Sequence, residues 1–355
     1  MTRLERLAAR LPQELDAGLI LSGINRRYYT GFPSSAGVLL VTRKESFFLI
    51  DFRYYEHAKA RITDCEVLLL EDETRQLNEL FDRYGIRSVG VEAGHMTLEE
   101  YRRYQERFPA VSFEDSDALQ LLISEDRICK TADEIELICA AQDIAERAFA
   151  ETLNFIEAGR TEREIALYLD YTMQKMGAEA LSFDTIVASG RNSAVPHAVP
   201  TDKPVAEGDF IVIDFGAVVG GYHSDMTRTV AVGPVSSEQE RVYDTVLRAQ
   251  LAAIDAVKAG VPCREIDLAA RKIIDNAGYA GCFGHSTGHG IGLEIHEAPS
   301  VGPRSETAAK AGMLFSVEPG IYLEGRFGVR IEDMVVVEEN GCRNLTKTKK
   351  DRISL

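Results

Sequence analysis

The sequence predicts an α+β protein of two domains, a smaller α/β domain over residues 1–124 and a larger α+β domain over residues 131–355. In the first segment, short apolar runs alternate with helical patterns, which is typical of a sheet covered by helices. In the second segment, the sequence resembles itself, which indicates two related halves. A chain of 355 residues is long enough for both domains.

The composition of the chain excludes several classes of function. It contains 40 Lys and Arg against 56 Asp and Glu, a formal net charge of −16, which argues against nucleic acid or an anionic membrane as the main partner. No apolar run approaches the ~20 residues of a membrane span. The N-terminal residues have an amphipathic helical pattern, unlike a signal peptide. The six cysteines are scattered without a CxxC pair and read as reduced thiols, so we expect a cytoplasmic protein.

The first domain begins with a helix and continues with five strands. Thr2 and Glu5 form a capping box ahead of leucines at helical spacing. The polar residues of this domain form no obvious catalytic set. The predicted strands are 17–22, 36–42, 46–51, 66–70 and 88–92, and the predicted helices lie near 53–61, 74–84 and 97–107.

A polar link, residues 124–130, is predicted to join the two domains. Thr131 and Glu134 then form a second capping box, which marks the start of a long helical pattern. This pattern extends to Ile156. The larger domain therefore begins at about residue 131.

The larger domain contains two pairs of similar segments. Residues 157–169, EAGRTEREIALYL, resemble residues 258–270, KAGVPCREIDLAA, and residues 196–216 resemble residues 295–320. Each half then has the order helix, glycine turn, helix, strand, loop and antiparallel strand pair. Two such halves packed about a pseudo-twofold axis would share a cleft. Chance similarity between two amphipathic helix pairs is the alternative explanation.

Alignment of the two halves places acidic residues in pairs. Asp214 lies opposite Glu318, each at the end of an apolar strand. Asp225 lies opposite Glu332, each in the strand that follows. A carboxylate in an otherwise apolar strand is unfavourable unless its charge is compensated. Four such carboxylates at matched places in two halves therefore indicate a cation between them.

A histidine-rich stretch, GHSTGHGIGLEIHEAP at residues 284–299, holds three of the seven histidines. His285 and His289 have the spacing of a zinc-binding helix, but the glycines around them favour an extended or irregular backbone. The alignment of halves places His296 opposite His197. One imidazole added to four carboxylates makes a hard, oxygen-rich donor set, which favours Mn, Co, Fe or Zn over Cu(I) or an iron–sulfur cluster.

The charge of the carboxylates indicates the number of metal ions. Four carboxylates carry the charge that two divalent cations neutralise. Two metals about 3.5–4 Å apart, bridged by carboxylates and a water, form a known hydrolytic arrangement, in which the pKa of the water falls toward roughly 7. Each residue alone has an ordinary structural explanation, but together they favour a metal centre. The candidate ligands are Asp214, Asp225, His289, Glu318 and Glu332.

The motifs around these residues closely resemble those of the creatinase/aminopeptidase P/prolidase family, whose catalytic domain has the pita-bread fold. They are DFGAVVGGYHSDMTRT (214–229), GHGIGLEIHEAP (288–299), EPGIY (318–322) and VRIED (329–333). The resemblance covers the whole chain, because residues 22–42 and 49–58 resemble the family's creatinase-like N-terminal domain. It implies a pita-bread metallopeptidase domain with the two-metal ligand set above, manganese being favoured, and hydrolysis of peptide bonds before proline.

The resemblance also implies roles for residues outside the ligand set. Residues 187–203 look like the segment that carries a substrate-side histidine, so His197 and His296 would line the substrate side of the metals. His285 matches a further active-site histidine, and Arg330 matches an arginine beside the last ligand. A histidine near the attacked carbonyl can stabilise the oxyanion or carry a proton to the leaving nitrogen. Glu318 matches the ligand proposed to transfer protons to and from the bridging water.

Three functions agree with these residues. We expect an Xaa-Pro aminopeptidase, which releases the N-terminal residue of short proline-containing peptides, with an Xaa-Pro dipeptidase (prolidase) as the alternative. A dipeptidase must bind a free carboxylate, for which arginine is well suited. Several dipeptidases of the family have an arginine directly after HE-x-P, where this chain has Ser300, although Arg304 follows. A metal-free peptide-binding scaffold is less favoured, because the chain keeps all five ligands. The family commonly dimerises, so a homodimer is expected.

Overall fold

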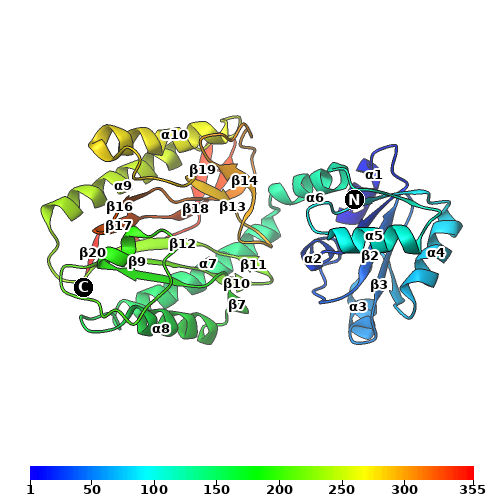
Figure 1. Ribbon diagram of the computed structural model, residues 1–355, viewed down its shortest axis with the longest axis horizontal. Coiled ribbons are helices and arrows are strands. Elements are labelled where there is room, and N and C mark those ends of the chain that lie inside the picture. The colour runs from blue at the N-terminus through cyan, green and yellow to red at the C-terminus, as the bar shows by residue number, and fades with distance from the viewer. The chain divides into compact units, whose positions relative to one another are not determined.

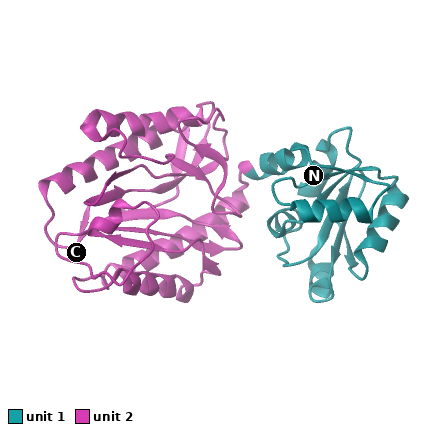
Figure 2. Cartoon of the chain, viewed as in Figure 1, with its two compact units in different colours: residues 1–127 teal, residues 128–355 magenta.

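The computed structural model describes all 355 residues, which divide into two compact units, residues 1–127 and residues 128–355 (Figure 2). Each unit has hydrophobic clusters of its own. None of the helices combines the length and apolar character that crossing a membrane requires. The chain is mixed helix and strand, as predicted.

Unit 1 is built around one six-stranded mixed sheet in the order β4-β3-β2-β1-β5-β6. Every predicted strand and helix is present within a few residues, and both Thr2 and Thr97 form capping boxes at helix starts. Two helices, α2 and α6, and one short strand, β6, were not predicted. The elements are α1 (Arg3–Arg10), β1 (Ala17–Ile20), α2 (Gly23–Thr30), β2 (Val38–Thr42), β3 (Ser46–Ile50), α3 (Tyr55–Arg61), β4 (Glu66–Leu69), α4 (Glu73–Tyr84), β5 (Ser88–Val91), α5 (Leu98–Arg107), β6 (Ser112–Glu114) and α6 (Ala118–Ile128).

The two units divide between residues 127 and 128, within the polar link predicted at residues 124–130, but this segment is not an irregular linker, because α6 extends through Ile128. Leu119 and Ile123 are buried one helical turn apart, which continues the helix into the polar residues. Asp126 accepts hydrogen bonds from Arg10 and from the Tyr29 hydroxyl, at 2.6 and 2.9 Å. The polar side chains of this segment therefore bind other parts of unit 1 instead of marking a free linker.

Unit 2 contains two halves with the same order of elements. Figure 1 shows the helix pairs α7–α8 and α9–α10 on opposite sides of the strands. The first half contains α7 (Ala132–Thr152), α8 (Glu162–Lys175), β7 (Ala180–Leu181), β8 (Ile186–Ser189), the 3-10 helix η1 (Gly190–Ala194), β9 (Phe210–Phe215), β10 (Ala217–Val219), β11 (Tyr222–His223) and β12 (Met226–Ala231). The second half contains α9 (Ser237–Ala256), α10 (Cys263–Ile274), the π-turn η2 (Asp275–Tyr279), β13 (Gly288–Gly290), β14 (Glu297–Val301), β15 (Leu314–Val317), β16 (Gly320–Leu323), β17 (Phe327–Arg330), β18 (Asp333–Glu338), β19 (Gly341–Asn344) and β20 (Ile353–Ser354).

Matched backbone features confirm the internal repeat predicted from the sequence. The turns between the helices of each pair contain Gly159 and Gly260, both with positive φ, 98° and 85°, which favours glycine. Isolated bridges join residue 161 to residue 204 in the first half and residue 262 to residue 308 in the second. The central strands also match, because β9 pairs antiparallel with β12 and β15 pairs antiparallel with β18. The fold is therefore the pita-bread arrangement.

The helix α7 ends at Thr152, whereas the sequence predicted its pattern to continue to Ile156. After the helix ends, Phe155 stacks on Tyr168 of α8, with 4.2 Å between ring centroids. Ile156 is buried in the core of the first half. The apolar pattern continued past the helix end because these residues are still packed in the core.

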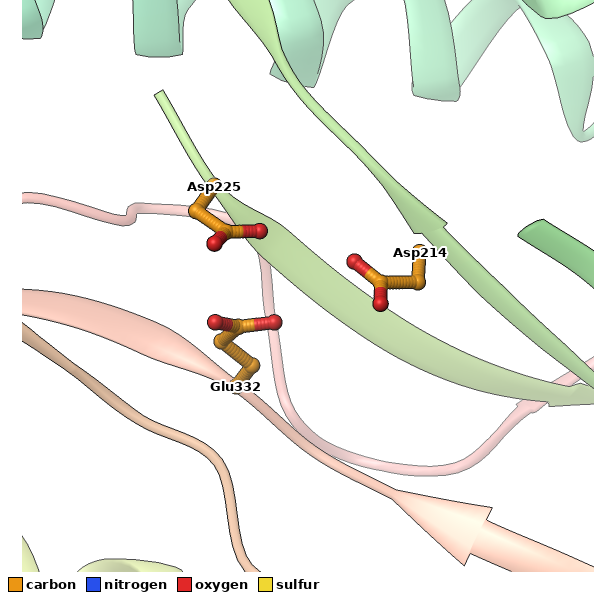
Figure 3. Close-up of side chains that lie close together, drawn as sticks. All are labelled: Asp214, Asp225 and Glu332. Atoms are coloured by element: carbon orange, nitrogen blue, oxygen red, sulfur yellow. The ribbon is translucent and has the colours of Figure 1, made fainter. Parts of the chain in front are cut away.

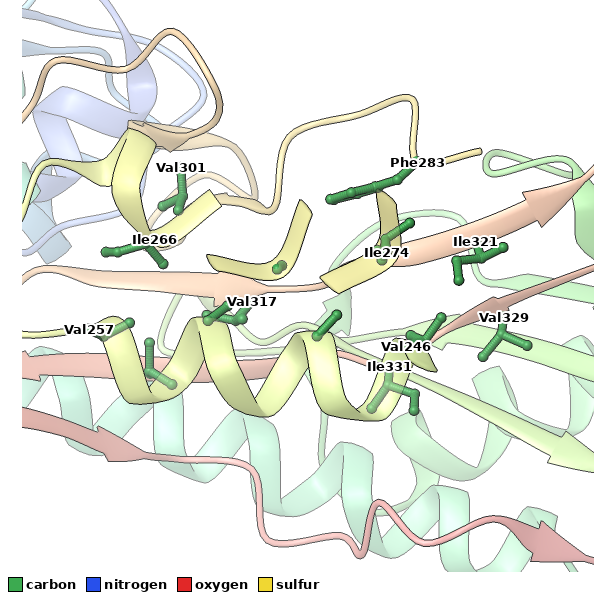
Figure 4. Packing of buried hydrophobic residues seen from close by; sticks show 14 of the residues in the cluster. Val246, Val257, Ile266, Ile274, Phe283, Val301, Val317, Ile321, Val329 and Ile331 are labelled. Carbon is green, nitrogen blue, oxygen red and sulfur yellow. The ribbon is translucent and has the colours of Figure 1, made fainter. Parts of the chain in front are cut away.

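A large aliphatic core supports the second half (Figure 4). Val246 of α9, Ile266 of α10 and Val317 of β15 are fully buried in it. Complete burial of such a side chain contributes about 1.5–3 kcal/mol. This packing gives a rigid base to the strands and loops that carry the polar residues described next.

Candidate metal centre

Four carboxylates reach one site from two antiparallel strand pairs. Asp214 is part of β9, and the register places it opposite Thr227 of β12. Glu318 follows β15 directly. Asp225 and Glu332 were predicted to lie within strands, but each is the last residue before one, β12 or β18. Asp225 and Glu332 thus precede the paired residues of these two strands, and their side chains point into the site.

Three of these carboxylates, Asp214, Asp225 and Glu332, form the tightest group. One oxygen from each lies within 4.8 Å of the others, and Figure 3 shows the side chains pointing toward one another. Asp214 Oδ1 and Glu332 Oε1 are buried and have no hydrogen-bond partner. Because buried polar atoms normally have a partner, these two oxygens fit a cation held between the carboxylates.

His289 and Glu318 extend the group. His289 Nε2 lies 3.6 Å from Asp225 Oδ2 and 3.5 Å from Glu318 Oε1. The other ring nitrogen, Nδ1, is 3.1 Å from the Gly290 carbonyl oxygen, so that it carries the hydrogen and leaves Nε2 as an acceptor. Burial, with a smaller effect of His296, lowers the pKa of His289 to about 4. The imidazole is therefore neutral at pH 7, which is the form that binds metal ions.

Burial and mutual repulsion disfavour the charged forms of these carboxylates. Burial raises the pKa of Glu318 to about 8, although Arg330 acts against it. Burial and then the charge of Glu332 raise the pKa of Asp225 well above its usual value, and burial and then Glu318 do the same for Glu332. Divalent cations among the carboxylates would restore the charged forms. Four carboxylates and one imidazole are also the donors that such cations prefer.

Arg330 and Thr227 hold the carboxylates in place. Arg330 Nη2 donates to Asp214 Oδ2 at 2.6 Å, and its Nε donates to Thr227 Oγ1 at 3.1 Å. Thr227 Oγ1 in turn donates to Glu332 Oε2 at 2.7 Å. Thr227 was given no role from the sequence, although it lies in the DMTRT motif. Only the strand register reveals that it lies opposite Asp214.

Tyr322 connects Arg330 to His285. The tyrosine oxygen accepts from Arg330 Nη1 at 2.9 Å and lies 2.9 Å from His285 Nε2. His285 Nδ1 is 2.8 Å from the Ser286 carbonyl oxygen, so Nδ1 carries the hydrogen and Nε2 accepts from the tyrosine. Burial, followed by Arg330, lowers the pKa of His285 to about 4. Tyr322 lies in the EPGIY motif, which is the signal that could have identified it.

A cavity of about 590 Å³ lies over this group of side chains. His197 and His296 are both exposed at its lining, and neither ring makes a hydrogen bond. The ring of His296 packs edge-on against His289, with 4.3 Å between centroids. All the site residues predicted from the sequence line this one cavity. The remaining wall is largely apolar and includes Phe183, Ile186, Pro196, Ala198, Val199, Pro200 and Ile295.

This fold and this site define a two-domain metallopeptidase. The family model described as Metallopeptidase family M24 matches residues 136–339, and the model of the Creatinase/Prolidase N-terminal domain matches residues 3–129. The chain belongs to Metallopeptidase family M24 and carries the N-terminal domain of its creatinase/aminopeptidase P/prolidase members. The resemblance inferred from the sequence motifs is thereby confirmed.

Similar proteins of this family match the chain over almost its full length. The chain is 38% identical over 352 residues to an Xaa-Pro dipeptidase from Pyrococcus furiosus, which covers 98% of this chain and 99% of that protein. Its structure matches that of an Xaa-Pro dipeptidase from Bacillus anthracis with a TM-score of 0.95, 40% identity and 99% coverage of both chains. An X-Pro aminopeptidase from Thermotoga maritima matches with a TM-score of 0.92 and 41% identity, covering 99% of this chain and 100% of that one.

Proposed function

We propose that the chain is a two-metal Xaa-Pro dipeptidase. The observation that carries the proposal is the buried carboxylate group with two unpartnered oxygens, facing His289 in a cavity with an apolar wall. The sequence favoured the aminopeptidase, but the names of similar proteins support the dipeptidase better, including prolidases from Pyrococcus horikoshii and Pyrococcus furiosus. A homodimer and a cytoplasmic location stay predictions.

The ligands proposed for the two divalent ions are the residues identified from the sequence. Such ions, when bound, lower the pKa of a water molecule and polarise the substrate carbonyl. Manganese stays the favoured choice among Mn, Co, Zn and Fe. The proposed ligands are Asp214, Asp225, His289, Glu318 and Glu332, all of which line the cavity.

The surrounding residues of the chain would orient the substrate and move protons. His197 and His296, exposed at the cavity lining, are placed to donate to the carbonyl oxygen or to give a proton to the proline nitrogen as it leaves. Glu318 matches the carboxylate that the family is proposed to use for proton transfer to and from the water, and its Oε1 lies 3.5 Å from His289 Nε2. Arg330 holds Asp214 in place through a 2.6 Å hydrogen bond.

The apolar wall of the cavity suits proline. Proline lacks an N–H group and presents a compact ring. Phe183, Ile186 and Ile295 offer this ring a surface that requires no hydrogen bond from it. The wall therefore favours substrates in which proline follows the bond that is cleaved.

Arg304 is the proposed partner of the free carboxylate of a dipeptide. It lines a second cavity of about 590 Å³, which shares Ser300 and other residues with the first. Its side chain is exposed and makes no hydrogen bond or ion pair, whereas Arg271 in the same cavity is bound to Asp267 at 2.8 and 2.9 Å. Arg304 is thus free to bind a carboxylate bidentately, in place of the arginine that other dipeptidases have at the position of Ser300.

The test compares kcat/KM for Ala-Pro and Ala-Pro-Ala with the same metal. We expect the dipeptide to be preferred at least tenfold, about 1.4 kcal/mol of transition-state stabilisation. Arg304→Ala should remove most of that preference, whereas Arg102→Ala, an exposed arginine of unit 1, should leave it unchanged. A preference for the tripeptide would contradict the dipeptidase and support the aminopeptidase instead. A purified protein without stoichiometric metal and without turnover would indicate the peptide-binding scaffold.

A further inference from the structure

The loop that carries His197 is bound at both ends by one buried carboxylate. Glu162, the first residue of α8, has no exposed surface. Its Oε1 accepts hydrogen bonds from the backbone N and the Oγ of Ser189, at 2.7 and 2.8 Å, where β8 ends and the loop begins. Its Oε2 accepts from the backbone N and the Oγ1 of Thr201, at 3.1 and 2.6 Å, where the loop ends. Asn192 Nδ2 spans both oxygens at 3.0 and 3.1 Å.

Glu162 is stabilised by these donors alone, since it forms no ion pair. Hydrogen bonds to an ionised acceptor are stronger than those between neutral groups. Removing the acceptor would leave the backbone N and the Oγ of the buried Ser189 unpaired and would release the less buried donors of Asn192 and Thr201. The carboxylate and the two ends of the loop therefore hold one another in place.

The part of the loop next to His197, in contrast, has few contacts, although Ser193 earlier in the loop is buried and accepts a hydrogen bond from the backbone N of Gly328 at 2.8 Å. Val195 and Val199, on either side of His197, are 55% and 77% exposed. The His197 ring makes no hydrogen bond. The hydrogen bond nearest to His197 in the sequence is accepted by the carbonyl oxygen of Pro196 from Arg330 Nη1, at 3.2 Å. The position of His197 over the cavity is therefore set by the backbone on either side of it and not by its own side chain.

We propose that Glu162 is a positioning residue that closes the loop of residues 189–201 and thereby keeps His197 at the cavity. The inference rests on the proposed function to the extent that His197 is taken to act on the substrate. Glu162 does not itself line the cavity. In Glu162→Gln, the amide NH₂ would face donors in place of an acceptor, and at least one end of the loop would be released.

The first experiment is a double-mutant cycle with Ala-Pro as substrate. We expect Glu162→Gln to lower kcat by about 10- to 100-fold with unchanged metal content, which is less than the roughly 10²–10⁴-fold contribution of an acid–base group because His197 is displaced and not removed. If Glu162 acts through His197, the double variant Glu162→Gln/His197→Ala should be no worse than His197→Ala alone. Additive losses, or loss of metal from Glu162→Gln, would overturn the proposal. Glu162→Asp keeps the charge and should show a smaller loss of kcat. It replaces Glu162→Gln in the experiment if that variant does not fold.

The second experiment requires no turnover. Arg191 is exposed inside the loop and provides a trypsin site. Cleavage after Arg191, followed by mass spectrometry, should be at least tenfold faster in Glu162→Gln than in the wild type. A rate equal to that of the wild type would overturn the proposal. If the wild type cleaves no Xaa-Pro peptide, the proposed function fails, but this measurement still decides whether Glu162 closes the loop.

Glu92 provides a matched control in unit 1. It is 1% exposed and accepts hydrogen bonds from the backbone N of Leu21 and Ser22 and from Asn25 Nδ2. Glu92→Gln should lower the stability of unit 1 without changing cleavage after Arg191. Equal acceleration in both variants would mean that general destabilisation, and not release of the His197 loop, causes the effect, and would also overturn the proposal.

Discussion

The two halves of unit 2 provide equal charge but unequal chemistry. Each half contributes two carboxylates from equivalent places, one at the end of its first central strand, β9 or β15, and one just before its partner, β12 or β18. The first half adds only His197, whereas the second adds three histidines and Arg330. The repeated strands thus place four carboxylates at equivalent positions, and the histidines and the arginine that differ between the halves make the site asymmetric.

The halves also differ in how they hold their histidines. In the second half, Asp267 of α10 accepts from the backbone N and the Oγ1 of Thr287, at 3.1 and 2.9 Å, in the middle of the histidine-rich stretch. Its ion-pair partner Arg271 donates to the carbonyl oxygens of Phe283 and His285. In the first half, Glu162 holds the His197 loop mainly at its ends. The backbone at His285 is therefore bound directly to α10, whereas His197 and the exposed His296 have no such contact.

Removal of one carboxylate charge should have the largest effect, and it should be equal in the two halves. Asp225→Asn and Glu332→Gln each replace an anionic ligand by an amide, which binds metal more weakly. We expect turnover to be abolished and bound metal to fall, with far-UV circular dichroism unchanged. Metal analysis and a peptidase assay at limiting metal measure this. Unchanged activity in either variant would show that the halves do not share one centre.

Removal of a histidine should have the second-largest effect and should separate ligands from substrate-side residues. His197→Ala and His296→Ala should retain metal but lose about 10²–10⁴-fold in kcat, the range for groups that transfer protons or stabilise an oxyanion. His289→Ala should lose metal as well. Metal content and kcat measured on the same preparations test this difference. Metal loss from His197→Ala would place that residue among the ligands and contradict the comparison of the halves.

The smallest expected effect is on the pH dependence of stability. In the metal-free protein Glu318 has a pKa of about 8, against its usual 4.5, so its folded form holds the proton more tightly. Its contribution to stability is complete below pH 4.5 and is lost as the pH rises through 8. His285 and His289, with pKa values of about 4 against 6.5, have the opposite sign and lose their contribution only as the pH falls below 6.5.

Between pH 6.5 and 8 the carboxylates should therefore dominate the change in stability, because the two histidines together change it by only about 0.8 kcal/mol in the opposite direction. The free energy of unfolding of chelator-treated protein should fall by about 1.5 kcal/mol from Glu318 alone. Urea denaturation at the two pH values measures this, with metal-loaded protein as the control. The loaded protein should show no such fall, because its carboxylates stay ionised in both conditions. A metal-free protein that is equally stable at both pH values would mean that the four carboxylates are not crowded as described.

The sequence by itself determined the two-half fold and predicted the polar residues that the structure brings together at one cavity. Asp214 and Glu318 were identifiable because a carboxylate in an apolar strand needs a compensating charge, and the internal repeat aligned them. His285 and His289 were correctly predicted to lie outside a helix, because glycines surround them. These are local signals, carried by neighbouring residues or by a repeat within the chain.

The tertiary structure decided which residues hold the site together. Thr227 binds Glu332 and Arg330, more than 100 residues away in the sequence, and Glu162 binds both ends of a loop that begins 27 residues later. No local pattern encodes such contacts, because they depend on strand register and on how helices pack against loops. The helical state of residues 124–128 was missed for the same reason, since it depends on contacts of Asp126 with Arg10 and Tyr29. Spatial contact between distant residues is the part of this protein that a sequence motif does not contain.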